Sequence, residues 1–173
     1  DGENRAREGL QARARILLGN PENETPQVSV LSSGLQFKVN FGSGQKTGFY
    51  LDQAINRQTG AAFCRDKRVL DCFSFAGTFA THALHSGASH VTIVDSSRAA
   101  CDAAVENLKL NNLYTEAAVN VITGDAFKVL RQLNESGQKF DVVILDPTKF
   151  AAHEAQVQQA ARGYKDINRQ GAL

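Results

Sequence analysis

The sequence contains no methionine, not even an initiator, and no apolar run that approaches the length of a membrane-spanning helix. It also carries no secretory signal, so we expect no membrane partner. The chain begins at Asp1 and stops at Leu173, directly after a stretch with a helical pattern. These features predict a segment of a longer protein, with a signal-processed mature chain as the alternative.

Cysteine is scarce and charge is balanced. The three cysteines form no C-x-x-C motif and no cluster with histidine at metal-ligand spacing, which predicts reduced thiols in a cytoplasmic protein without a metal site. A net charge of +1 excludes a strongly basic surface, so any contact with nucleic acid has to come from a local patch or from parts outside this chain. The G-x-G-x-x-G motif of dinucleotide-binding folds is absent as well.

What is present is an ordinary globular composition, 42% hydrophobic and 21% charged, in a chain long enough for one domain. The N-terminal part predicts a small annex over residues 1–60, and the remainder, residues 61–173, an α/β body. The annex is expected to contain a helix over 5–18, a hairpin made of 28–31 and 35–41, a glycine-rich loop, and a helix near 53–59. In the hairpin, apolar and polar residues alternate from Leu35 onward, which indicates one buried face.

From Lys67 onward, strand-like apolar runs alternate with helical patterns. The expected strands cover 69–73, 91–95, 119–122 and 141–145, and the expected helices cover 77–86, 98–110 and 126–134. This alternation indicates right-handed βαβ units, and hence an α/β, Rossmann-like fold with a mostly parallel sheet and helices on both faces. The run 142–145 is apolar without alternation, as in a strand covered on both faces.

The stretch 68–79 is the part around which the rest is organised. A short buried strand ends at Asp71, and a turn that contains Gly77 leads into an apolar helix. Such a turn points backbone N–H groups at a ligand above the sheet. Asp71 would repel a phosphate but suits an ammonium group. A ligand with a nucleoside at one end and an amino acid at the other, such as S-adenosylmethionine, fits both features, while the alternative is a plain strand–turn–helix.

All four expected strands end in or just before an aspartate: Asp71, Asp95, Asp125 and Asp146. Because ligands of an open parallel sheet bind beyond the carboxyl ends of its strands, these acids are expected to lie together. Asp95 follows the first turn by about 20 residues, the spacing at which an acid accepts hydrogen bonds from ribose hydroxyls. Asp125 either caps the next helix or accepts from an adenine amine, and its position alone favours the cap.

The order of these motifs resembles a class I S-adenosylmethionine-dependent methyltransferase and, more closely, the bacterial large-subunit ribosomal RNA 5-methylcytosine methyltransferases. The segments that carry the resemblance are 44–53 (GQKTGFYLDQ), 69–77 (VLDCFSFAG), 146–150 (DPTKF) and 162–168 (RGYKDIN). The resemblance covers nearly the whole chain and implies methyl transfer from S-adenosylmethionine to a cytosine of large-subunit ribosomal RNA, after a cysteine thiolate has added to the ring. It also implies that the sheet is incomplete at the C-terminus.

The resemblance implies a role for each matched residue. Asp71, Ser74 and Gly77 would line the methionine end of the cofactor, Asp95 would hold the ribose, and Asp125 and Phe127 would bracket the adenine. Lys46, Thr47 and Phe49 would close the pocket from the annex side. Phe73, Ser96 and Ala126 complete the expected cofactor-binding set. Asp146 would face the target base.

Two departures from the family pattern matter. Thr148 stands where the family usually has a second proline, so the base-binding edge is expected to be looser. The family's nucleophilic cysteine would lie beyond Leu173, and Cys72 is interpreted as a small buried hydrophobe. We therefore expect this segment alone to be inactive. The alternatives are methylation of an exocyclic amine, a segment that binds the cofactor without turnover, and, from another class, a dinucleotide-dependent oxidoreductase.

The run 142–145 bears on assembly. It contains no charge, proline or bulge signal that would protect an open sheet edge. If it lies at the edge of the sheet, we expect the isolated chain either to self-associate through it, as in a homodimer, or to be only marginally folded.

Overall fold

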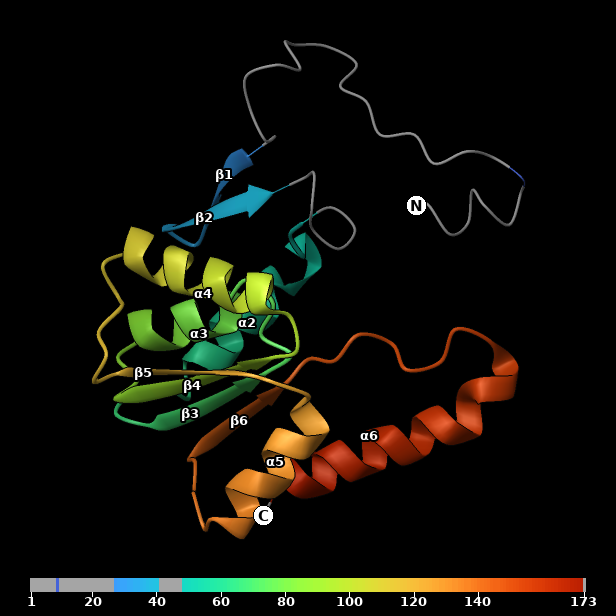
Figure 1. Ribbon diagram of the computed structural model, residues 1–173. Helices are drawn as coiled ribbons and strands as arrows, with labels where there is room; N and C mark the ends of the chain where they lie inside the picture. Colours follow the sequence, from blue (N-terminus) through green and yellow to red (C-terminus); the bar gives the residue numbers. More distant parts are fainter. Residues whose placement is uncertain (1–8, 10–26, 41–47, 173) are drawn as a thin grey trace.

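The computed structural model describes residue 9, residues 27–40 and residues 48–172. The helix expected over 5–18 and the positions Lys46 and Thr47 lie outside the described residues. Within them, the structure contains a two-stranded antiparallel sheet and a four-stranded parallel sheet, and helices lie between the two sheets (Figure 1). No helix of the described residues is both long and apolar enough to cross a membrane.

The parallel sheet is the centre of the molecule. Its strands are β3 (Arg68–Cys72), β4 (His90–Asp95), β5 (Val119–Thr123) and β6 (Val142–Leu145), in the spatial order β5-β4-β3-β6. All four expected strands are present. The first ends at Cys72 rather than at Phe73, because Phe73 has a φ of 61°, which no extended strand accommodates.

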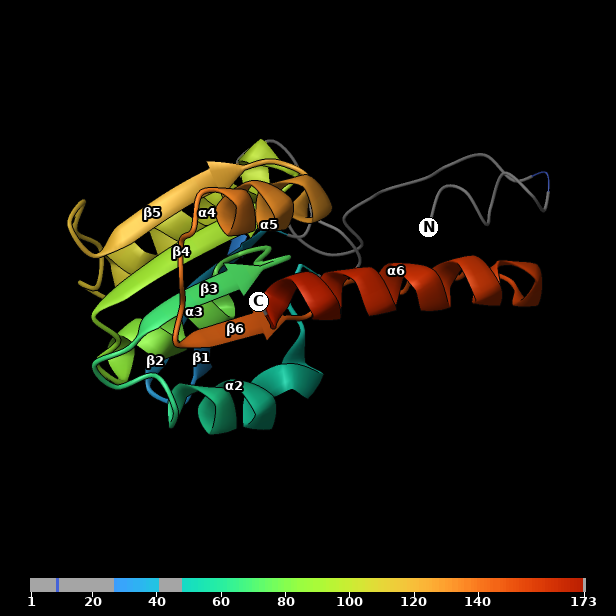
Figure 2. The ribbon, with the colours of Figure 1, turned by 90° about the horizontal axis from the view of Figure 1, so that it is seen from below.

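Helices cover both faces of this sheet, as expected from the alternating pattern (Figures 1 and 2). One face carries α2 (Ala54–Ala61), α3 (Thr78–His85) and α4 (Arg98–Leu110), and the other carries α5 (Ala126–Glu135) and α6 (Val157–Gly171). Short 3₁₀ turns, η1 (Leu51–Gln53) and η2 (Glu154–Gln156), precede α2 and α6.

Successive residues of β3 point to opposite faces and so enter two different cores. Val69 packs under α3 and α4 with Ile93 and Leu108, whereas Leu70 packs under α5 and α6 with Leu130. This placement explains why β3 and β4 are almost continuously buried, since both of their faces are covered.

The antiparallel sheet is the expected hairpin, formed by β1 (Gln27–Ser32) and β2 (Leu35–Asn40). Ser33 and Gly34 form its turn with φ values of 54° and 80°, the positive pair that a tight two-residue hairpin requires. Leu35, Phe37 and Val39 are buried as the alternation predicted.

Asn107 of α4 and Asn111, the C-cap of this helix, attach the hairpin to the body. The amide N–H of Lys38 donates to Oδ1 of Asn107 at 2.8 Å, and that of Gln36 donates to Oδ1 of Asn111 at 2.9 Å. Helix α2 runs across residue 60, the expected boundary between annex and body, and packs on α3. The division into 1–60 and 61–173 stays a prediction.

Candidate functional site at the carboxyl edge of the sheet

The loop between β3 and α3 is the most strained backbone near the carboxyl edge. Phe73, Phe75 and Gly77 all have left-handed torsions, with φ values of 61°, 51° and 69°. A non-glycine residue at positive φ costs free energy and is concentrated at ligand-binding loops. The loop is held by the N–H of Ser74, which donates to the Val94 carbonyl at 3.2 Å. The turn predicted at Gly77 is therefore present, and the structure adds two strained phenylalanines.

Gly77 is required for packing as well as for its torsion. A Cβ atom at this position would lie 2.6 Å from the Cβ of Ala104 on α4. No real side chain accepts that distance, so only glycine lets the start of α3 approach α4 this closely. The loop and the two helices above the sheet are thereby fixed relative to one another.

Asp71 lies beneath this loop and is only 1% exposed. Its Oδ2 accepts from the Ser74 hydroxyl at 2.6 Å and from the Ala80 N–H at 3.1 Å, so it satisfies a free donor in the first turn of α3. Burial raises the pKa of this carboxyl to about 7, although both hydrogen bonds oppose the shift. The observed role is to shape the loop, and direct contact with an ammonium group stays a prediction.

Asp95 is half-buried at the end of β4, so a ligand can reach its carboxylate. Its Oδ2 accepts from the Phe75 N–H at 2.9 Å and its Oδ1 from the Ser97 N–H at 2.9 Å. A carboxylate has about four acceptor positions, so each oxygen retains one for a hydroxyl group. Ser96 lies exposed beside it. This arrangement fits the expected contact with a ribose.

Asp125 caps α5, the role that its sequence position favoured. Its Oδ1 accepts from the Lys128 N–H at 3.0 Å, and the side chain is exposed. Ala126 is buried beneath it, and Phe127 is half-buried at the same helix end. The cap leaves a second carboxylate oxygen available, and contact of Asp125 and Phe127 with an adenine stays a prediction.

An aromatic cluster joins the loop after β6 to α6. The ring of Phe150 lies 4.4 Å from Tyr164, 5.7 Å from Phe127 and 6.3 Å from Phe73, measured between centroids. Gly163 allows this approach, because a Cβ there would lie 3.2 Å from the Phe150 ring. The segments 146–150 and 162–168, which were matched separately in sequence, are thus in direct contact.

Asp146 follows β6 and is half-buried. Burial raises its pKa, the charge of Asp52 raises it further, and the charge of Arg57 lowers it. Asp146 in turn raises the pKa of Asp71. The acids after β3 and β6 therefore lie close enough to influence one another, as a common site requires.

The annex side of the site is formed by Phe49 and Tyr50. Phe49 is buried against Phe37, with ring centroids 5.4 Å apart, and the Tyr50 ring contacts Phe75 edge-on at 5.8 Å. The Nη1 group of Arg57 donates to the Tyr50 carbonyl at 2.9 Å. Sequence reasoning missed Arg57, because an arginine within a polar helix is normally a solvent-facing residue.

The three cysteines lie in the interior of the molecule. Cys64, Cys72 and Cys101 are all free and buried. Burial raises the pKa of the Cys72 thiol to about 12, so it carries almost no thiolate at neutral pH. Within residues 9, 27–40 and 48–172, no group of His, Cys, Asp and Glu is arranged to hold a metal ion.

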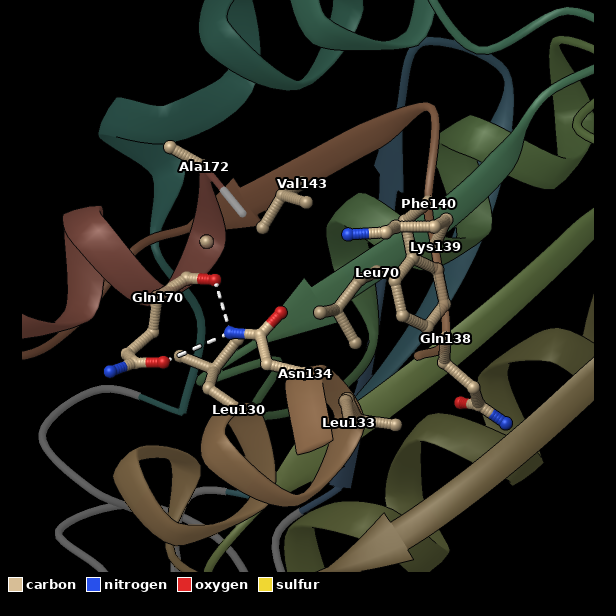
Figure 3. Close-up of a pocket in the computed structure, with 11 residues that line it drawn as sticks. Leu70, Leu130, Leu133, Asn134, Gln138, Lys139, Phe140, Val143, Gln170 and Ala172 are labelled. Carbon is tan, nitrogen blue, oxygen red and sulfur yellow. Dashed lines mark hydrogen bonds between the residues drawn. The ribbon is translucent and has the colours of Figure 1, made fainter. Parts of the chain in front are cut away.

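A cavity of about 120 Å³ lies elsewhere, between α5, α6 and the β3–β6 pair (Figure 3). Leu70, Leu130 and Val143 form much of its wall, and Nδ2 of Asn134 donates to the carbonyl of Gln170 at 2.8 Å and to its Oε1 at 2.9 Å (Figure 3). None of the expected site residues lines it. This cavity therefore lies apart from the expected site residues.

Comparison with known proteins finds similar methyltransferases. Ribosomal RNA large subunit methyltransferase I of Pseudoalteromonas translucida is 45% identical over 168 residues, which are 97% of this chain and 42% of that protein. The putative SAM-dependent methyltransferase from Streptococcus mutans has a similar structure, with a TM-score of 0.75, 25% identity, and coverage of 90% of this chain and 40% of that one. A putative methyltransferase crystallised with SAH gives a TM-score of 0.71 at 25% identity, over 87% of this chain and 41% of that one.

The chain spans less than half the length of the curated relatives that it matches. A family model of S-adenosylmethionine-dependent methyltransferases matches residues 7–170. The match includes the strained loop, the strand-end acids and the segment 162–168 that packs on Phe150. The chain therefore belongs to the S-adenosylmethionine-dependent methyltransferase family.

Proposed function

We propose that this chain is the cofactor-binding part of a methyltransferase that modifies C5 of a cytosine in large-subunit ribosomal RNA. The observation that carries the proposal is the group of aspartates at the carboxyl ends of the parallel strands, beside the strained loop 73–77. The relative named ribosomal RNA large subunit methyltransferase I supports the choice of substrate.

The side chains of this edge suit S-adenosylmethionine, which supplies an activated methyl group when bound. Asp95 keeps acceptor positions for ribose hydroxyls, and Phe127 offers an apolar surface at the same edge. The acidic character of the edge matches the sulfonium and ammonium charges of the ligand. Asp146 orients the target base, which has to leave its stack to reach the site.

C5 of cytosine is a weak nucleophile, so this chemistry needs a thiolate that adds to the ring. Cys72 is unsuited, because it is buried and its thiol has a strongly raised pKa. We therefore propose that the nucleophile belongs to the longer protein and that this chain alone binds the cofactor without methylating RNA. Three free cysteines and a ribosomal RNA substrate also support a cytoplasmic location.

Calorimetric titration with S-adenosylhomocysteine tests the site. Asp95→Ala should weaken binding at least about tenfold, because a charge-assisted hydrogen bond contributes roughly 1.5–3 kcal/mol. Asp102→Ala is the matched control, since Asp102 is an exposed aspartate of α4 that pairs with Arg98 at 3.0 Å. Equal affinity of both variants and the unmodified chain would refute the ribose assignment.

Incubation with labelled cofactor and undermodified ribosomal RNA tests the reaction. We expect no 5-methylcytosine from this chain alone. Robust formation of 5-methylcytosine would show that a cysteine of this chain is the nucleophile. Methylation of an exocyclic amine would instead favour an enzyme that needs no cysteine.

A further inference from the structure

Arg57 is a buried cation with unused hydrogen-bond donors. Its side chain is 1% exposed, and it lies on α2, a helix that contains no other charged residue. Nη1 donates to the Tyr50 carbonyl at 2.9 Å, but Nε and Nη2 have no partner among the described residues. A buried donor without a partner loses its hydration and gains nothing in return. Such a group in a native protein requires an explanation.

The neighbours of Arg57 do not meet this need. Its guanidinium lies 4.9 Å from the centroid of the Phe49 ring, a contact that stabilises the charge but leaves the N–H groups unused. Asp52 and Asp146 act on its charge from a distance. Neither forms an ion pair with it: the ion pairs of the described residues involve Arg98, Arg131 and Arg169 instead.

The unused donors have a specific shape. In the planar guanidinium group, Nε–H and one Nη–H point in the same direction along one edge. They form a fork that matches the two oxygens of a carboxylate. Here the Tyr50 carbonyl occupies Nη1, and the fork of Nε and Nη2 has no partner in the part of the chain that the structure describes. A free arginine fork in a buried position is suited to one planar anion.

The position of Arg57 connects this fork to the proposed cofactor site. It holds the carbonyl of Tyr50, whose ring contacts Phe75 in the strained loop. It also lowers the pKa of Asp146, so the two charges are near each other. The charges that shift the pKa values of Asp71 and Asp146 belong to Asp52, Asp95, Asp146 and Arg57, and Arg57 is the cation among these four.

We propose that Arg57 binds the α-carboxylate of the amino-acid end of S-adenosylmethionine through Nε and Nη2. This inference rests on the proposed function. The ligand carries two positive centres, which the aspartates of the edge match, and one carboxylate, which those aspartates repel. Arg57 supplies the opposite charge for that carboxylate and discriminates the complete cofactor from nucleosides that lack the amino acid.

Two ligands separate this role from a purely structural one. S-adenosylhomocysteine carries the amino-acid end, whereas 5′-methylthioadenosine has the same nucleoside and thioether without it. Calorimetry should show that Arg57→Gln weakens binding of S-adenosylhomocysteine at least tenfold and changes binding of 5′-methylthioadenosine less than twofold. Arg98→Gln, which removes an exposed arginine, should change neither.

A second variant guards against loss of folding. If Arg57→Gln does not give a cooperative unfolding transition, Arg57→Lys keeps the charge but removes the fork, and it should show the same selective loss at smaller size. Equal losses for both ligands, or no loss for either, would overturn the carboxylate assignment. If the unmodified chain binds neither ligand, the proposed function fails instead. If it binds both equally tightly, only the role of Arg57 fails.

Discussion

The carboxyl edge of the parallel sheet and the cavity between α5 and α6 differ in almost every property that marks a functional site. The edge holds Asp71, Asp95 and Asp146, a loop with strained torsions, and a buried arginine whose Nε and Nη2 have no partner among the described residues. The cavity is lined by apolar side chains and by the polar side chains of Asn134, Gln138 and Gln170, and Lys139 is the charged residue among the described residues that form it (Figure 3).

This difference shows that concavity and chemistry are separate signals. A hollow requires only that side chains fail to fill a space, whereas strained torsions and buried charges cost free energy and persist where the surrounding structure compensates them. Several such features lie close together at the edge, whereas the cavity has no comparable group of strained torsions and buried charges among the described residues. Four experiments can sharpen or refute this contrast.

The largest effect is expected for Asp71→Asn. The pKa of Asp71 is about 7 in the folded chain, above its usual value of 3.8, so as pH rises Asp71 loses its proton first in the unfolded state. The free energy of unfolding should therefore fall as pH rises from about 4 to about 7, by on the order of 4 kcal/mol for this group. Asparagine does not titrate, so the variant should lack this component.

Urea denaturation of both proteins across that pH range measures the effect as a difference, in which the contributions of other groups cancel. Below about pH 4 this contribution of Asp71 to stability is fully present, and above about pH 7 it is lost. Parallel stability profiles for the two proteins would show that Asp71 is not protonated by burial.

The next effect is expected for Gly77→Ala compared with Gly137→Ala. Both glycines have nearly the same torsion, with φ values of 69° and 70°, but only Gly77 faces an atom within contact distance. Gly137→Ala should cost about 1 kcal/mol for the torsion alone, and Gly77→Ala about 3 kcal/mol because a clash with Ala104 is added. Equal denaturation midpoints for the two variants would contradict the close approach of α3 and α4.

A smaller effect is expected for Asn134→Ala at the cavity. The change removes two hydrogen bonds to Gln170, so the free energy of unfolding should fall by about 1–2 kcal/mol. Affinity for S-adenosylhomocysteine should stay within about twofold of the unmodified chain, because the cavity is remote from the edge. A tenfold loss of affinity with unchanged stability would move the ligand site to the cavity.

The smallest effect concerns the two edge strands of the sheet. We propose that the chain self-associates weakly through β6, whose single neighbour among the described residues is β3. β6 carries four apolar residues, whereas β5 carries Asn120 and Thr123. With rising concentration, light scattering should show a rising mean particle mass. Because the Asp141 N–H donates to a carbonyl of β3 and the N–H groups of a strand alternate in direction, the amides of Val142 and Ile144 face the open edge. These two amides should gain more protection from hydrogen exchange than those of β5. A monomer at all concentrations would exclude this interface.

Sequence alone predicted the four parallel strands, the helices between them and the gathering of Asp71, Asp95 and Asp146 at one edge. These follow from local patterns and from a general rule, because the carboxyl ends of parallel strands meet at the same side of a sheet. The hairpin and the helix cap formed by Asp125 could also be predicted from the sequence, because period-two alternation and helix starts are properties of neighbouring residues.

Tertiary structure decided how these residues act. Asp71 is buried and Asp95 is half-buried, although both follow a strand, because the loop 73–77 closes over the first and not the second. Arg57 is a candidate cofactor-binding residue because the packing of α2 on α3 removes its guanidinium from water. Burial depends on contacts between residues far apart in the chain, and no local pattern contains that information.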